Sequence, residues 1–161
     1  MRKKITKKTK HPNRCNCAMC GKNPIDMDIW ESEQLMKHGF YIHVVSEHDP
    51  ESPSGFNAHT HGMHLLGHPD FQITMPLNSI DHVGVFFHDM CSRVKKGQSF
   101  SHGDIVEDLL ANGYLARLID ATENGRPVLR IVFADKHNRI MPEEMSPNEA
   151  IAQYGYSRTS P

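Results

Sequence analysis

The sequence has no long hydrophobic run, and this absence excludes several classes of protein. No apolar stretch approaches the roughly 20 residues that a membrane-spanning helix requires. No apolar segment follows the basic N-terminus, so no secretory signal is evident. We therefore expect a cytoplasmic protein with reduced thiols and no membrane partner.

Several catalytic motifs are also absent. The sequence contains no glycine-rich phosphate loop, no Gly-x-Ser-x-Gly elbow and no paired acid motif. Nucleotide hydrolysis and serine catalysis therefore have no support. Cysteine is scarce, with four in 161 residues, but three of the four fall between positions 15 and 20.

Acidic residues are missing from the first part of the chain, so the formal net charge of −1 hides an uneven distribution. Residues 15–161 hold 11 basic against 19 acidic side chains. A basic arm of this kind can contact the phosphates of a nucleic acid, but a short Lys-rich terminus is more often a solubilising tail, and the acidic remainder disfavours such a partner. The basic residues of the arm are Arg2, Lys3, Lys4, Lys7, Lys8, Lys10 and Arg14.

The length and the order of the predicted elements indicate a single α+β domain. We expect residues 1–25 to be a basic arm with a Cys-rich knuckle, and residues 26–161 to be the domain. Its mostly antiparallel sheet would be covered by a long central helix. The predicted helices span 28–38 and 79–96, with a short final helix near the C-terminus. The predicted strands span 40–46, 56–61, 71–75, 114–119 and 128–133, with 105–110 ambiguous.

Two local signals fix the ends of these elements. Asn124-Gly125 suits a two-residue hairpin turn between the last two strands. Ser146, Pro147 and Glu149 provide a cap, a first-turn proline and a capping-box acid for the final helix, which ends near Gly155.

A Cys-x-Cys-x-x-Cys motif gives the first metal signal. Cys15, Cys17 and Cys20 place three thiolates within reach of one Zn²⁺. A fourth ligand would come from His11, from a histidine of the run 59–68, or from Cys91, which its helix marks instead as a small buried residue. The alternatives are free surface thiols, a redox motif, or an iron–sulfur cluster, which normally takes four thiolates.

Four histidines within ten residues give the second signal. In a strand, His59 and His61 share one face, and His64 can return to them after Gly62, so three imidazoles would meet at one metal ion. His43 is a reserve ligand if its strand is a neighbour. The alternative is that these are solvent-facing or hydrogen-bonded strand histidines.

The histidine run at residues 59–68 also suggests an enzyme. Three nitrogen ligands and an open position lower the pKa of bound water toward 7 and generate hydroxide. His59-Thr60-His61-Gly62-Met63-His64 resembles the His-x-His-x-Asp-His signature of metallo-β-lactamase-like hydrolases, with Met63 in place of the acid. A metal-dependent hydrolase built on His59, His61 and His64 is thus the alternative to a zinc-stabilised binding or accessory module.

The order of motifs over residues 36–135 resembles a bacterial family, domain of unknown function 4262. The most specific matches are Gly67-His68-Pro69-Asp70 and the helix exit Val-x-x-Gly-x-x-Phe-x-x-Gly-Asp at 94–104. Because the family has no established activity, the resemblance implies a domain assignment and no mechanism. Members usually carry an aromatic-Thr-aliphatic-Gly-Leu strand where this chain has His59 to Met63, so the resemblance implies no metal role for the histidines.

Overall fold

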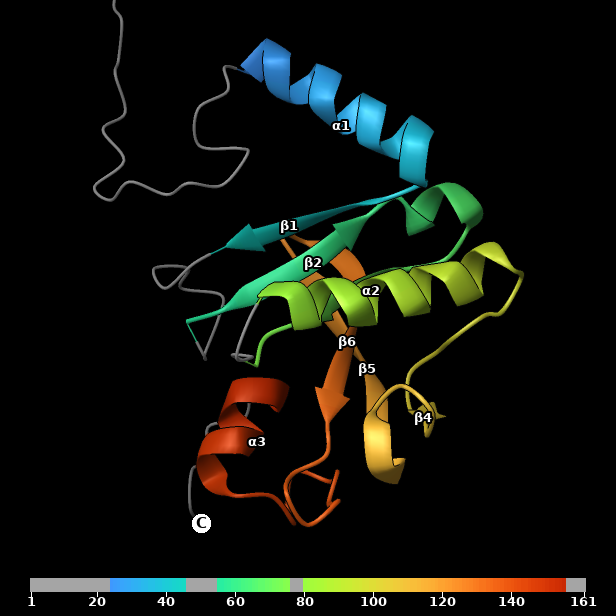
Figure 1. Cartoon of the computed structure of the whole chain (residues 1–161). Helices are drawn as coiled ribbons and strands as arrows, with labels where there is room; N and C mark the ends of the chain where they lie inside the picture. Colours follow the sequence, from blue (N-terminus) through green and yellow to red (C-terminus); the bar gives the residue numbers. More distant parts are fainter. Residues whose placement is uncertain (1–23, 46–54, 76–79, 156–161) are drawn as a thin grey trace, which may run out of the picture.

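The computed structural model describes residues 24–45, 55–75 and 80–155, and in these ranges a six-stranded sheet is combined with three α-helices (Figure 1). The α+β class predicted from the sequence is therefore confirmed. The helices are α1 (Pro24–His38), α2 (Ile80–Lys95) and α3 (Pro147–Tyr154), and 3₁₀ turns lie at η1 (Met63–Leu66) and η2 (Ala111–Gly113). The strands are β1 (Tyr41–Val45), β2 (Asn57–His61), β3 (Asp70–Ile73), β4 (Ile105–Val106), β5 (Ala116–Glu123) and β6 (Arg126–Phe133).

The sheet is mixed, because one parallel pair joins the otherwise antiparallel strands that the sequence predicted. Its strand order is β1-β2-β3-β6-β5-β4, and every neighbouring pair is antiparallel except β3 with β6. Parallel neighbours cannot be joined by a tight turn and need a long connection. Here the chain between β3 and β6 supplies it, because it contains α2, β4 and β5.

The two faces of the sheet have different chemistry. On one face, side chains such as Phe71 and Leu129 form a buried cluster with α2 residues that include Phe87 and Met90. Figure 1 shows α2 lying across this part of the sheet. The opposite face is apolar near α3, where Ile119 and Val132 lie in a smaller cluster. Over β1, β2 and β3 that face carries histidine and other polar side chains.

Local sequence signals determine the hairpin and the last helix as predicted. Asn124 and Gly125 have φ angles of 49° and 73°, and β5 and β6 pair right up to Glu123 and Arg126 on either side of them. Two consecutive positive φ angles are what the tight hairpin turn requires. The Ser146 side chain accepts a hydrogen bond from the Glu149 amide and caps α3.

Some element bounds differ from the prediction. Helix α1 begins at Pro24, four residues before the predicted start, and the ambiguous segment 105–110 contains only the two-residue strand β4. The 3₁₀ turn η1 within the histidine run was not predicted. Residues 1–23 of the predicted arm and knuckle (1–25) lie outside the described residues, whereas residues 24 and 25 belong to α1. Among the helices of the described ranges, none has both the length and the apolar character of a membrane span.

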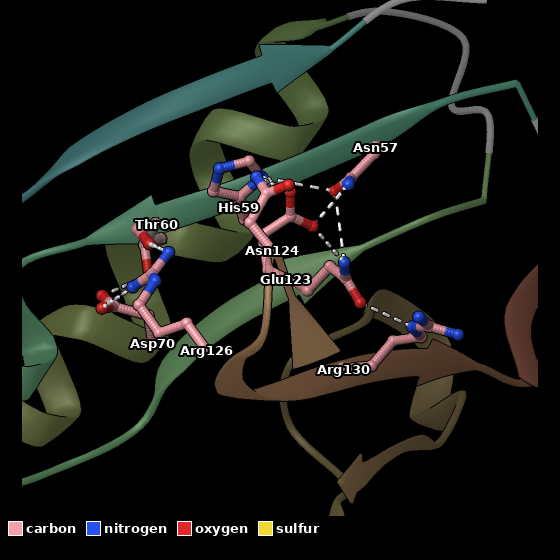
Figure 2. Close-up of polar contacts among 9 residues, drawn as sticks. Asn57, His59, Thr60, Asp70, Glu123, Asn124, Arg126 and Arg130 are labelled. Carbon is pink, nitrogen blue, oxygen red and sulfur yellow. Dashed lines mark hydrogen bonds and ion pairs between the residues drawn. The ribbon is translucent and has the colours of Figure 1, made fainter. Parts of the chain in front are cut away.

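A buried carboxylate joins the end of β2 to β3 and to the β5–β6 hairpin. Asp70 is 1% exposed. One of its oxygens accepts hydrogen bonds from the Thr60 hydroxyl and the Met63 amide, both at 3.0 Å. The other lies 2.6 Å from the Arg126 guanidinium (Figure 2). The same oxygen lies 3.1 Å from His64 Nδ1. Because a buried carboxylate without its hydrogen-bond partners is costly, these contacts tie the end of β2 to β3 and to the hairpin.

Gly62 allows the end of β2 to approach the start of β1 closely. Its φ is 133°, and a Cβ atom built there would lie 2.5 Å from the Gly39 carbonyl oxygen and 2.9 Å from Phe40 Cα. Both contacts are with backbone, which cannot move aside without shifting β1.

We therefore expect Gly62→Ala to lower the free energy of unfolding by at least about 2 kcal/mol, because strain and overpacking add. Gly67→Ala is the matched control, since Gly67 also has a positive φ of 72° but no atom within 4 Å of the added Cβ. Its loss should be about 1 kcal/mol. Urea denaturation of both variants measures the difference, and equal losses would contradict the close approach.

Candidate metal centre

Three histidines from β1 and β2 converge on the polar face of the sheet. His43 lies directly opposite His59 in the antiparallel register, and His61 is two residues further along β2. Side chains two apart in a strand share a face, and cross-strand partners lie side by side. One ring nitrogen of each histidine lies within 4.8 Å of the corresponding nitrogens of the other two. In the part of the chain that the structure describes, this is the one group with three potential metal ligands.

The rings are packed against one another and against Tyr41. The ring centroids of His59 lie 5.0 Å from those of both His43 and His61. The Tyr41 ring stacks on His61 with a centroid distance of 4.7 Å and an interplanar angle of 8°. In a tetrahedral site with imidazole nitrogens about 2.0–2.1 Å from Zn²⁺, the nitrogens lie about 3.3–3.4 Å apart. Closing the group on an ion therefore requires side-chain rotations that bring the three nitrogens closer together.

The buried carboxylate of Glu123 lies next to the His59 ring. Glu123 is 2% exposed, and one carboxylate oxygen accepts hydrogen bonds from the side-chain amides of Asn57 at 2.5 Å and Gln72 at 2.7 Å. His59 Nδ1 lies 3.6 Å from the other carboxylate oxygen and 3.4 Å from Asn57 Oδ1 (Figure 2). Both neighbours of Nδ1 are acceptors, so they favour a proton on this nitrogen. The tautomer with Nδ1 protonated leaves the lone pair on Nε2, the form in which imidazole binds a metal.

The electrostatic environment keeps His61 neutral. The pKa of His61 is lowered from 6.5 to about 4, chiefly by burial and in addition by the positive charge of Arg126 and by the neighbouring His59. At pH 7 the ring is thus uncharged and able to coordinate a cation. Burial together with an interaction with Glu31 raises the pKa of Tyr41, which keeps the stacked phenol protonated.

The structure separates the other two histidines of the run from this group. His64 lies in η1, where its Nδ1 is 3.1 Å from Asp70 and its side chain is 54% exposed. The 3₁₀ turn places Met63 in the core and turns the next side chain toward Asp70 instead of toward His59. His68 is buried, its Nε2 accepts a hydrogen bond from the Phe100 amide, and its Nδ1 lies 2.6 Å from the Pro69 carbonyl oxygen. Both ring nitrogens of His68 therefore have structural partners.

The cysteine signal falls mostly beyond this description. His11, Cys15, Cys17 and Cys20 lie outside the described residues, so the zinc knuckle stays a prediction. Cys91 is fully buried in the apolar cluster under α2, and burial raises the pKa of its thiol to about 12. A protonated thiol in an apolar core is a packing residue, as its helical position indicated.

Sequence reasoning did not identify Glu123 as part of the site. It lies outside the strands predicted at 114–119 and 128–133, yet it is the last residue of β5. The signal was present, because a two-residue turn makes Glu123 and Arg126 a cross-strand pair and not loop residues. What the sequence did not contain was the strand order that brings this hairpin end next to β2.

The lowered pKa of His61 predicts a pH-dependent stability of the metal-free protein. The unfolded state takes up a proton on this ring below about pH 6.5, whereas the folded state does so only near pH 4. Protonation in this window therefore favours the unfolded state, and stability is lost as the pH falls from about 6.5 toward 4. Denaturation at several pH values in the presence of a chelator should show a shallower pH dependence for His61→Gln than for the wild type. His82→Gln, at an exposed position of α2, is the control, and identical slopes for wild type and His61→Gln would contradict the assignment.

Comparisons of the chain with family models, with curated proteins and with solved structures found no match. The resemblance of residues 36–135 to domain of unknown function 4262 therefore rests on its sequence motifs and stays a prediction.

Proposed function

We propose that this protein binds a zinc ion through His43, His59 and His61 and acts as a metal-stabilised binding or accessory module. The observation that carries the proposal is the convergence of three imidazole nitrogens within 4.8 Å of one another on adjacent strands. The backbone pairing of β1 with β2 fixes the spacing of the three Cα atoms. A metal ion would therefore meet a largely formed set of ligands.

Zinc fits the chemistry of these ligands. Neutral imidazole suits Zn²⁺, Cu²⁺ and Ni²⁺, whereas Mg²⁺ and Ca²⁺ prefer oxygen. Zn²⁺ has no geometric preference from its d electrons and accepts a tetrahedral site with three histidines. The carboxylate of Glu123 would balance part of the charge of the ion and orient His59, as outer-shell acids commonly do for metal-bound histidines.

A zinc-dependent hydrolase is the second candidate. Three protein ligands leave a fourth position for water, and His43 and His61 are only partly buried, which favours access from solvent. In this arrangement His43 would take the place that the sequence assigned to His64. Zinc-bound water with a pKa near 7 would supply hydroxide.

The cysteine knuckle is a separate metal proposal. Cys15, Cys17 and Cys20, with His11 as one choice of fourth ligand, would hold a structural zinc independently of the sheet. The two sites differ in ligand chemistry, so variants of each can be compared in the same full-length protein.

A variant that lacks one of the three sheet histidines should lose tight binding of one zinc ion per chain. We expect His59→Ala or His61→Ala to weaken zinc binding at this site by at least about 100-fold, because a ligand contributes more than an outer-shell residue. Competition with a chromophoric chelator measures the affinity and the stoichiometry of the full chain. His82→Ala, which alters an exposed histidine of α2, should bind like the wild type.

The cysteine variants complete this experiment. The triple variant Cys15→Ser, Cys17→Ser, Cys20→Ser should still bind the zinc ion that depends on the sheet histidines. It should lose only the zinc ion bound by the cysteine knuckle. If His59→Ala and His61→Ala bind zinc with the stoichiometry and affinity of the wild type, the sheet site does not exist. Hydrolysis of ester, phosphoester or amide substrates that disappears in His59→Ala would favour the second candidate over the accessory module.

Glu123 should control the affinity of this site without contacting the ion. We expect Glu123→Gln to weaken zinc binding by about 10- to 100-fold, the usual effect of losing an outer-shell carboxylate. The ¹⁵N resonances of His59 in the metal-free protein report which ring nitrogen carries the proton, and the Nδ1-protonated form should lose population in the variant. Circular dichroism checks that the variant is folded. An unchanged zinc affinity and an unchanged tautomer in a folded variant would rule out the orienting role.

A further inference from the structure

We propose that the cleft between α1, the start of β1 and α2 binds a small aromatic phosphate of the nucleoside monophosphate class. Two adjoining hollows, of about 240 and 250 Å³, form this cleft. They share three lining residues, His38, Phe40 and His88. The two hollows therefore adjoin each other, and none of the three histidines of the β1–β2 group lines either of them.

One end of the cleft is aromatic. Trp30 and Tyr41 line it, with their ring centroids 5.6 Å apart at an interplanar angle of 67°. Tyr41 is 9% exposed, stacks on His61 and is hydrogen-bonded to Glu31, so the partly exposed ring of Trp30 is the one available to a planar ligand. The side-chain amide of Gln34 lies in the same lining. Aromatic rings offer a surface on which a planar base stacks, and an amide can both donate to and accept from the edge of a base.

The other end of the cleft is basic. Lys37, His88, Ser92 and Lys95 line it, and no acidic residue belongs to the described lining of either hollow. Lysine ammonium groups and a hydroxyl are donors that suit a phosphate. This local positive charge contrasts with the acidic composition of residues 15–161.

Two of the basic groups are held in position by their neighbours. The Lys95 ammonium donates a hydrogen bond to the His38 carbonyl oxygen at 2.9 Å, at the C-terminal end of α1. The His88 ring packs edge-to-face on Phe40, with centroids 4.9 Å apart. Phe40 is 5% exposed and lines both hollows. Donors fixed in advance lose less conformational entropy when a ligand binds.

A ligand that uses both ends must combine a planar ring with an anionic group. A nucleoside alone would leave the basic end unused, and inorganic phosphate would leave the aromatic end unused. A nucleoside monophosphate satisfies both in one small molecule. The proposal does not depend on zinc binding, so it stands or fails separately from the function proposed above.

Fluorescence of Trp30 provides a direct test, because it is the only tryptophan of the chain. Full-length protein would be titrated with adenosine monophosphate in the presence of a chelator, with calorimetry as a second readout. We expect a saturable change in emission and a dissociation constant at least about 10-fold lower than for adenosine or inorganic phosphate, since each lacks one set of contacts. Lys37→Ala and His88→Ala should each raise the dissociation constant for adenosine monophosphate by about 10-fold.

Lys96→Ala is the matched control, since Lys96 adjoins Lys95 in the sequence but lines neither hollow. It should bind like the wild type. The proposal is overturned if adenosine monophosphate gives no saturable signal by either method, if inorganic phosphate binds as tightly, or if Lys37→Ala and His88→Ala bind no more weakly than Lys96→Ala.

Discussion

The pairing of β1 with β2 is the constraint on which the candidate metal centre depends. The antiparallel register sets His43 opposite His59 and leaves His61 on the same face. A slip of one residue in either strand would move its histidines to the other face, where the apolar cluster under α2 has no room for polar rings. The core under α2 therefore specifies the register, and the register specifies the site. Gly62 contributes by letting the end of β2 lie close to the start of β1.

Two buried carboxylates connect this pair of strands to the rest of the sheet. The Asp70 carboxylate accepts hydrogen bonds from Thr60, Met63 and Arg126. The Glu123 carboxylate accepts hydrogen bonds from the side-chain amides of Asn57 and Gln72. Arg126 and Glu123 face each other across the tight turn of the β5–β6 hairpin. One short turn thus supplies both the cation that neutralises Asp70 and the acid that stands behind His59. In the described residues no buried side-chain nitrogen or oxygen lacks a hydrogen-bond partner, which such a polar interior requires.

Features that depend on only a few consecutive residues could be predicted from the sequence. The hairpin at Asn124-Gly125 and the cap of α3 at Ser146 were predicted because the required φ angles and capping groups are local properties. The shared face of His59 and His61 was readable for the same reason. The start of α1 was misplaced although Pro24 suits the first turn of a helix.

Features that depend on the order of the strands in the sheet could not be predicted from the sequence in this way. His43 was a conditional choice, because only the pairing of β1 with β2 brings it to His59. His64 was grouped with His59 and His61, but Met63 enters the core and the following side chain meets Asp70. Glu123 reaches β2 only because β3 pairs with β6 across a long connection. No short sequence motif marks the parallel pairing of β3 with β6. The presence of Glu123 beside the three histidines therefore follows only from the topology of the sheet.

The central claim is that His43, His59 and His61 hold one zinc ion. Anomalous diffraction at the zinc absorption edge, from crystals of the full chain grown with zinc, tests it most directly. We predict a single peak between the three rings, about 2.0–2.1 Å from one nitrogen of each. Zinc density confined to other sites, with no peak between these rings, would contradict the account.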